Sequence, residues 1–168
     1  MSRFQVKKVA VLGAGVMGAQ IAAHLVNVRV PVVLFDLAAK EGPKNGIVTR
    51  AIDNLKKLKP APLGDVADAG LIEQANYDDN LDKLASYPVT AGSEALPEAL
   101  KPRFCGIHFF NPPRYMFLVE LINTPTTEPQ VLDDLEAFVT STEVMKVSSW
   151  SRISGLVSVV GISSTRCM

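Results

Sequence analysis

Short apolar runs and a stretch of helical spacing alternate in the N-terminal part of the chain. Continuous apolar runs at residues 9–12 and 32–35 predict two buried strands, at about 8–12 and 32–36. Between them, residues 16–28 repeat apolar side chains at helical spacing, which predicts an amphipathic helix. The apolar face of this helix consists of Met17, Ile21, Leu25 and Val28. The pattern therefore predicts a strand–helix–strand unit, which is typical of a parallel sheet covered by helices.

The pattern further along the chain predicts mostly helices and then two strands. We expect helices at about 44–58, 65–74 and 79–85, a brief strand at 76–77, a helical turn at 97–100, strands at 103–110 and 118–122, and a helix at 129–140. Pro60 and Pro62 end the first of these helices. Residues 86–92 have no clear period. The serine-rich segment 143–168 also lacks one, so we expect a disordered tail.

Glycines in the turn after the first strand carry a clear chemical signal. The sequence GAGVMG occupies residues 13–18. Gly13 permits the turn, Gly15 lets a pyrophosphate approach the backbone, and Gly18 allows the helix to pack closely on the strand. The first N–H groups of the helix have no intrahelical acceptor and favour an anion. We therefore expect a dinucleotide site formed by Gly13, Gly15, Val16, Met17, Gly18 and Asp36.

Asp36 ends the second strand and indicates which dinucleotide binds. A carboxylate at this position accepts hydrogen bonds from the hydroxyls of the adenosine ribose and repels a 2′-phosphate, so NAD is favoured over NADP as the cofactor. A competing interpretation is a secretory signal, because Arg3, Lys7 and Lys8 precede the apolar run. The glycines within that run, and its continuation into a helix and a second strand, favour the dinucleotide site.

Composition narrows the functional classes. The chain has 168 residues, of which 48% are hydrophobic and 20% charged, and a formal net charge of zero. This balance gives no reason to expect a nucleic acid or an anionic membrane as a partner, and no apolar stretch is long enough to span a bilayer. The two cysteines are too few for a disulfide framework, and we expect Cys105 to be a buried thiol in a reducing, cytoplasmic compartment.

A second candidate site pairs a histidine with a glutamate. His108 lies at the end of a predicted strand, and Glu120 follows twelve residues later in the next one. A dehydrogenase without zinc needs a base for the hydroxyl proton, and histidine suits that task because free imidazole titrates near neutral pH. A carboxylate bonded to the other ring nitrogen would fix the tautomer and stabilise the imidazolium. The spacing alone also fits a pair that arises by chance.

Together these motifs resemble the 3-hydroxyacyl-CoA dehydrogenase family. The resemblance rests on residues 13–18, on Asp36, and above all on residues 106–113 (GIHFFNPP) followed by 119–122 (VELI). It is closest to bacterial bifunctional β-oxidation proteins. It implies an α/β fold with a Rossmann-like parallel sheet and flanking helices. It also implies NAD-linked oxidation of L-3-hydroxyacyl-CoA to 3-oxoacyl-CoA, with His108 as general base and Glu120 as the residue that orients it.

The sequence departs from the family pattern in its middle. After residue 85 the family continues with a strand–helix–strand unit on the order of 30 residues or more, which holds part of the nicotinamide site and a serine that orients substrate. Here only residues 86–92 stand in its place. We therefore expect an incomplete NAD-binding domain at 1–142, with a first mononucleotide half at 1–85 and a remnant of the second half at 93–142.

The segment after residue 142 departs as well. The family continues there into a helical domain that supplies an asparagine of the site, the walls around the acyl chain and the dimer contact, whereas residues 143–168 resemble none of it. The missing central unit also removes the neighbour of the strand at 8–12. We expect that the strand carrying His108 moves in beside it, or that the edge stays open and the chain aggregates.

The function therefore stays open between two hypotheses of different class. In the first, the chain oxidises an acyl-CoA substrate as its family does. In the second, it is a non-catalytic NAD-binding fragment, and a dinucleotide-dependent regulatory or partner-binding module is a third, weaker possibility. We expect weak binding of the ADP-ribose part of NAD and negligible turnover of acetoacetyl-CoA, because the reactive half of the site is incomplete.

Overall fold

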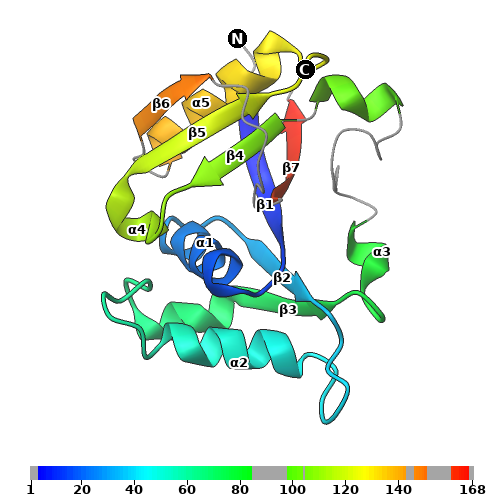
Figure 1. The fold of residues 1–168 in the computed structure, drawn as a ribbon, viewed down its shortest axis with the longest axis vertical. Coiled ribbons are helices and arrows are strands. Elements are labelled where there is room, and N and C mark those ends of the chain that lie inside the picture. Colours follow the sequence, from blue (N-terminus) through cyan, green and yellow to red (C-terminus); the bar gives the residue numbers. More distant parts are fainter. Residues whose placement is uncertain (1–3, 85–97, 104, 143–145, 151–159, 167–168) are drawn as a thin grey trace.

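A parallel sheet forms the N-terminal half of the molecule. The structure, a computed structural model, describes residues 4–84, 98–103, 105–142, 146–150 and 160–166. The elements of this half are β1 (Phe4–Leu12), α1 (Val16–Asn27), β2 (Val32–Asp36), α2 (Gly46–Leu55) and β3 (Ile72–Asn76). Strands β1, β2 and β3 run parallel in the order β3-β2-β1, and α1 and α2 lie on one face of them (Figure 1). This confirms the expected α/β, Rossmann-like architecture with flanking helices.

The segment predicted as a helix at 65–74 is only partly helical. Val66–Leu71 forms a 3₁₀ helix that begins where the Asp65 side chain accepts a hydrogen bond from the Ala67 backbone, and Ile72–Asn76 is a strand. The helix prediction was wrong there because β2 offers a free edge, and pairing with it outweighs the local preference. The expected brief strand at 76–77 is thus the end of a longer one.

A second, smaller sheet follows. After α3 (Leu81–Leu84), which lies beside β3 (Figure 1), the described elements are a 3₁₀ helix (Glu98–Arg103), β4 (Cys105–Phe109), α4 (Pro113–Met116), β5 (Leu118–Asn123), α5 (Pro129–Thr142) and β6 (Lys146–Trp150). The strand order is β4-β5-β6, with β4 and β5 antiparallel and β5 and β6 parallel. The strands and helix expected at 103–110, 118–122 and 129–140 are therefore confirmed. Residues 86–92, for which no element was predicted, lie outside the described residues.

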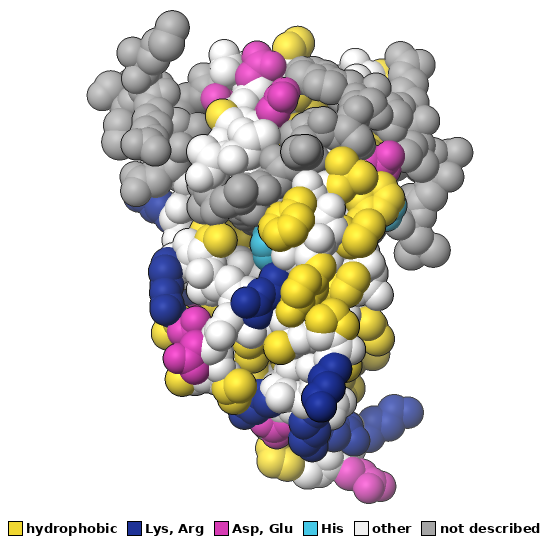
Figure 2. All heavy atoms as spheres, turned by 90° about the vertical axis from the view of Figure 1, so that its left-hand side faces the viewer, with side chains coloured by type: hydrophobic (Ala, Val, Ile, Leu, Met, Phe, Trp, Pro, Cys, Tyr) yellow, Lys and Arg dark blue, Asp and Glu magenta, His cyan; other side chains and the backbone are white. Residues whose placement is uncertain are grey.

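The short helix α4 connects the two antiparallel strands at the surface. Tyr115 and Met116 of α4, and Phe117 directly after it, are 41%, 46% and 51% exposed. Figure 2 shows hydrophobic side chains gathered on this side of the molecule, at mid-height. The connection between β4 and β5 therefore presents an apolar surface. Pro113, at the first turn of α4, is buried.

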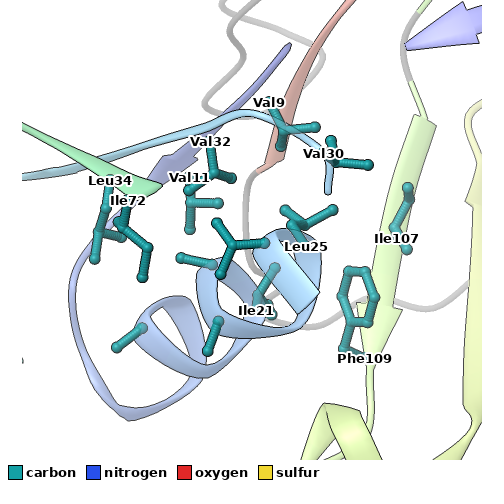
Figure 3. Packing of buried hydrophobic residues seen from close by; sticks show 14 of the residues in the cluster. Val9, Val11, Ile21, Leu25, Val30, Val32, Leu34, Ile72, Ile107 and Phe109 are labelled. Carbon is teal, nitrogen blue, oxygen red and sulfur yellow. The ribbon is translucent and has the colours of Figure 1, made fainter. Parts of the chain in front are cut away.

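One hydrophobic cluster joins the two sheets. It includes Val9 and Val11 of β1, Ile21 and Leu25 of α1, and Ile107 and Phe109 of β4. In Figure 3, Ile107 and Phe109 point from β4 toward α1, which lies between the two sheets. Because the same helix is buried by both sheets, the position of β4 is tied to that of the glycine turn through the packing of α1.

The strand β7 (Val160–Arg166) replaces the neighbour that β1 lacks. It pairs antiparallel with β1 from Phe4↔Arg166 to Val11↔Val160, and completes a sheet of order β3-β2-β1-β7. We expected a disordered tail at 143–168, but the structure forms strands β6 and β7 there, while residues 143–145, 151–159 and 167–168 lie outside the described residues. The expected outcomes for the edge of β1 were also wrong, since neither the His108 strand nor solvent occupies it.

Breaking the β7 ladder is expected to destabilise the N-terminal sheet. Val9 N donates to Pro31 O on the β2 side, so the N–H groups of β7 that face β1 belong to alternate residues such as Ser163, opposite Lys8. Ser163→Pro removes such an N–H in the middle of the pairing and is expected to lower the urea midpoint and increase light scattering, because the buried run of β1 loses its cover. Ser163→Ala, which keeps the N–H, is the matched control and is expected to lower the midpoint far less. Equal midpoints for the two variants would show that the pairing contributes nothing.

Candidate functional site

The turn between β1 and α1 has the geometry that its glycines predict. Gly13 has a φ of +95°, a backbone conformation that residues with a Cβ rarely adopt. A Cβ on Gly18 would lie 1.8 Å from the carbonyl oxygen of Gly13, so the helix approaches the turn more closely than any other residue allows. Around Gly15 there is open space, with nothing within 4 Å of the position of a Cβ.

The first turn of α1 faces this open space. Gly15 is the N-cap residue, and no side chain there accepts a hydrogen bond from the first turn. The first intrahelical hydrogen bond is donated by Ala19 N to Gly15 O, at 3.0 Å. Backbone N–H groups of a first turn lack intrahelical acceptors and bind anions. Val16 is 69% exposed at this end, whereas Met17 packs against the core. The turn therefore offers donors and room for a phosphate group.

Asp36 closes the same turn from the side of β2. One carboxylate oxygen accepts a hydrogen bond from Ala14 N at 2.6 Å, and the other accepts one from Leu37 N at 2.7 Å. These bonds fix the carboxylate beside the glycines, and each oxygen retains acceptor capacity for a hydroxyl group. The six residues expected to bind a dinucleotide thus gather at one end of β1 and β2, and their donors, space and carboxylate fit its pyrophosphate and ribose.

Tyr77 belongs to the same corner and was not predicted. Its ring stacks on Phe35 with 5.7 Å between centroids, and its backbone N–H donates to Asp36 O at 3.2 Å. Burial, and next the charge of Asp36, raise the pKa of the Tyr77 hydroxyl. A correct assignment of β3 would have revealed this residue, because the carboxyl ends of parallel strands meet at one edge of the sheet.

His108 and Glu120 form a direct pair. They lie opposite each other in the β4–β5 ladder, and His108 Nδ1 is 2.9 Å from Glu120 Oε2. The histidine side chain is 42% exposed and the glutamate side chain 19%. The imidazole packs against the ring of Phe110, with 4.9 Å between the ring centroids. Alternation along β4 explains the placement: Ile107 and Phe109 point into the core, so His108 points away from it. The pair leaves Nε2 of His108 available to a reactant.

The two groups of candidate residues are carried by different sheets. The glycines and Asp36 lie at the N-terminal end of α1, whereas β4 packs beside the part of α1 that holds Ile21 and Leu25 (Figure 3). In the described ranges, no hydrogen bond or ion pair joins one group to the other. The structure therefore brings each predicted group together internally, and links the two through α1.

Two further properties bear on the sequence predictions. Cys105 is partly buried at the start of β4, and burial raises the pKa of its thiol to about 12, so it is unreactive. Cys167 lies outside the described residues. In the described segments, no helix combines the length and the apolarity needed to cross a bilayer.

A family comparison matches most of the chain. The model described as 3-hydroxyacyl-CoA dehydrogenase, NAD binding domain, matches residues 8–101 and 86–149. The match comes in two segments, whose border falls around residues 86–101, where the sequence departs from the family pattern. It continues to residue 149, beyond residue 142, where we expected the resemblance to end.

Relatives with curated names are longer than this chain. A protein named "Probable 3-hydroxyacyl-CoA dehydrogenase" from Deinococcus radiodurans is 34% identical over 177 positions, which cover 82% of this chain and 51% of the relative. A protein of the same name from Bacillus subtilis is 30% identical over 186 positions, which cover 79% of this chain and 24% of the relative. The chain thus spans about half of the first relative and about a quarter of the second. The alignment with the Deinococcus protein has 177 positions, which is more than the 168 residues of this chain. Some residues of the relative therefore face a gap within the aligned region, as expected if an internal segment is missing here.

Solved structures show the same fold. A 3-hydroxybutyryl-CoA dehydrogenase from Escherichia coli has a TM-score of 0.62 at 23% identity, covering 85% of this chain and 38% of that one. A (S)-3-hydroxybutyryl-CoA dehydrogenase from Ralstonia eutropha has a TM-score of 0.58 at 21% identity, covering 85% and 62%. The family match carries the assignment, and these structures support the fold. The chain belongs to the family of the 3-hydroxyacyl-CoA dehydrogenase NAD-binding domain, an incomplete Rossmann-like domain whose cofactor is NAD.

Proposed function

We propose that this chain carries out NAD-linked oxidation of L-3-hydroxyacyl-CoA to 3-oxoacyl-CoA. The observation that carries the proposal is the contact of 2.9 Å between His108 Nδ1 and Glu120 Oε2. In the tautomer that donates a hydrogen bond from Nδ1–H to Glu120, Nε2 has a lone pair that can accept the hydroxyl proton of the substrate. The carboxylate then stabilises the imidazolium that forms. NAD, when bound, would accept the hydride from the carbon that bears this hydroxyl group.

The glycine turn and Asp36 would hold the cofactor for this reaction. The N–H groups at the start of α1 would bind the pyrophosphate, and the space beside Gly15 admits it. The Asp36 carboxylate, fixed by two backbone N–H groups, would accept the ribose hydroxyls. These residues bind and orient, and they take no part in proton transfer.

An acyl-CoA is the substrate class that the relatives support. Besides the two dehydrogenases, they include a fatty acid oxidation complex subunit alpha from Acinetobacter baylyi, 30% identical over 76% of this chain. We place the reaction in the cytoplasm, in keeping with the reduced, partly buried thiol of Cys105.

A second candidate function is NAD binding without turnover, which is the outcome expected from the sequence because the reactive half of the site is incomplete. It is favoured by the pairing of β7 against β1, because an antiparallel strand lies where the parallel sheet of a complete domain continues. In this case the adenosine and pyrophosphate half of the site works alone, since the gapped alignment with the Deinococcus relative indicates that other parts have no counterpart.

One pair of measurements separates the two functions. Oxidation of NADH in the presence of acetoacetyl-CoA, followed by absorbance, measures the reaction in reverse, while calorimetry measures NAD binding. Turnover that requires both substrates supports the dehydrogenase. NAD binding with no turnover overturns it in favour of the second candidate, and a folded chain that does not bind NAD contradicts both.

Neutralising Asp36 is expected to weaken the preference for NAD over NADP. Asp36→Asn retains an oxygen for the Ala14 N–H but removes the charge that would repel a 2′-phosphate. A charge-assisted hydrogen bond contributes about 1.5–3 kcal/mol, so NAD affinity should fall at least about tenfold. Calorimetry with both nucleotides measures the ratio. Asp53→Asn, on the exposed face of α2, is the control, and an unchanged ratio in Asp36→Asn would remove Asp36 from the site.

A further inference from the structure

Residues of α4 bind a loop of the N-terminal half. Arg114 Nη1 donates to the carbonyl oxygen of Ala61 at 3.0 Å and also to that of Leu63. The Tyr115 hydroxyl donates to the same Ala61 oxygen at 2.7 Å. The two side chains also contact each other, with the guanidinium 5.7 Å from the centre of the tyrosine ring. Two consecutive residues of α4 thus hold one turn of backbone, which we call the 61–64 loop.

The 61–64 loop is also held by α1. Asn27, at the end of this helix, donates to Pro62 O at 2.9 Å and accepts from Gly64 N at 2.8 Å. Pro62 and Leu63 are buried, and Pro60 and Pro62 restrict the backbone. A loop whose carbonyls are fixed in this way presents a rigid acceptor surface to Arg114.

The position of this contact in the chain gives it consequences. Helix α4 is the direct connection between β4, which carries His108, and β5, which carries Glu120. The His108–Glu120 bond keeps the two side chains together but does not place them relative to the nucleotide-binding half. Apolar packing of Ile107 and Phe109 ties β4 to α1, but the hydrophobic effect that drives it is not directional. Among the described residues, Arg114 and Tyr115 supply directional hydrogen bonds across this interface.

We propose that Arg114 and Tyr115 are positioning residues that set where the His108–Glu120 pair stands relative to the cofactor-binding turn. The proposal rests on the proposed function, because it concerns the placement of that reaction's base. Displacement of a reacting group by about 1 Å can lower a rate about 100-fold. Loss of either contact should therefore change the position of the base without changing the base itself.

A distance measurement tests the placement without relying on turnover. Spin labels at Asn54→Cys on α2 and Met116→Cys on α4 report the separation of the two halves, in a background with Cys105 and Cys167 replaced by alanine. Both label sites are exposed. We expect one narrow distance distribution for the parent, and a clearly broader or shifted one for Arg114→Ala. Arg50→Ala is the matched control, since the side-chain bond of Arg50 runs to Gly46 O of its own helix.

Tyr115→Phe keeps the test decisive if Arg114→Ala fails to fold. It removes only the hydroxyl and retains the ring beneath the guanidinium, so we expect a smaller broadening. Calorimetric NAD binding and the urea midpoint of the labelled variants show that the nucleotide half is intact. Distributions as narrow as the parent's in both variants overturn the proposal.

A kinetic measurement then connects placement to the reaction. With acetoacetyl-CoA and NADH, we expect Tyr115→Phe to lower kcat while KM for NADH stays at the parent value. A purely structural role would lower both the active fraction and stability, and leave kcat per folded molecule unchanged. If the parent chain shows no turnover, the proposed function fails, and the distance measurement still decides whether Arg114 and Tyr115 position the pair.

Discussion

Replacing His108 by alanine is expected to lower kcat for acetoacetyl-CoA reduction by about 100- to 10,000-fold, the range that a general acid or base contributes. In this reverse direction the imidazolium donates the proton that the oxidation removes. Alanine leaves no group at this position to hold a proton, and the neighbouring Glu120 Oε2 loses its partner at 2.9 Å. NAD affinity should stay unchanged, because the glycine turn and Asp36 lie on the other sheet.

Glu120→Gln separates orientation from proton transfer. The amide oxygen of glutamine can still accept a hydrogen bond from Nδ1–H, so His108 keeps its tautomer. The negative charge that stabilises an imidazolium is lost. We expect a smaller decrease in kcat than for His108→Ala, and no change for Glu128→Gln, which lies exposed ahead of α5. Equal rates for His108→Ala and the parent would show that the pair has a structural role only.

Local patterns were sufficient for the elements that carry the candidate residues. Strand β2 ends at Asp36 and helix α1 begins at Val16, as the sequence predicts, because the glycine turn, the apolar run and the helical spacing lie within one continuous segment. The strand with His108 was found for a similar reason, since the motif at residues 106–113 ends at prolines that stop it.

Pairings between distant segments could not be predicted. Strand β3 has no alternation of its own and forms because β2 offers an edge, and the same holds for the pairing of β7 with β1. The bonds from Arg114 to the carbonyls of Ala61 and Leu63 join residues about fifty positions apart, and backbone acceptors have no signature in the sequence. Tyr77 escaped notice because its role depends on β3.

Gly18→Ala is expected to abolish NAD binding and to destabilise the fold, whereas Gly15→Ala is expected to affect binding alone. The added methyl of Gly18→Ala would lie 1.8 Å from Gly13 O and 3.1 Å from Gly13 C, so backbone must move. Alanine gains up to about 1 kcal/mol of helix propensity, but overpacking costs about 1–3 kcal/mol or more. The movement displaces the turn that Asp36 holds through Ala14. Urea unfolding and calorimetry measure the two effects.

Gly15→Ala provides the contrast, because its Cβ meets nothing within 4 Å and the residue has a φ of −65°. Alanine is accommodated there without strain, so the urea midpoint should not fall. The methyl group occupies the space that a pyrophosphate would enter, and NAD affinity should decrease strongly. Gly70→Ala, which also meets nothing within 4 Å, should change neither quantity. Full NAD affinity in Gly15→Ala would mean that the cofactor does not approach this turn, even though Asp36 and the start of α1 are arranged to receive it.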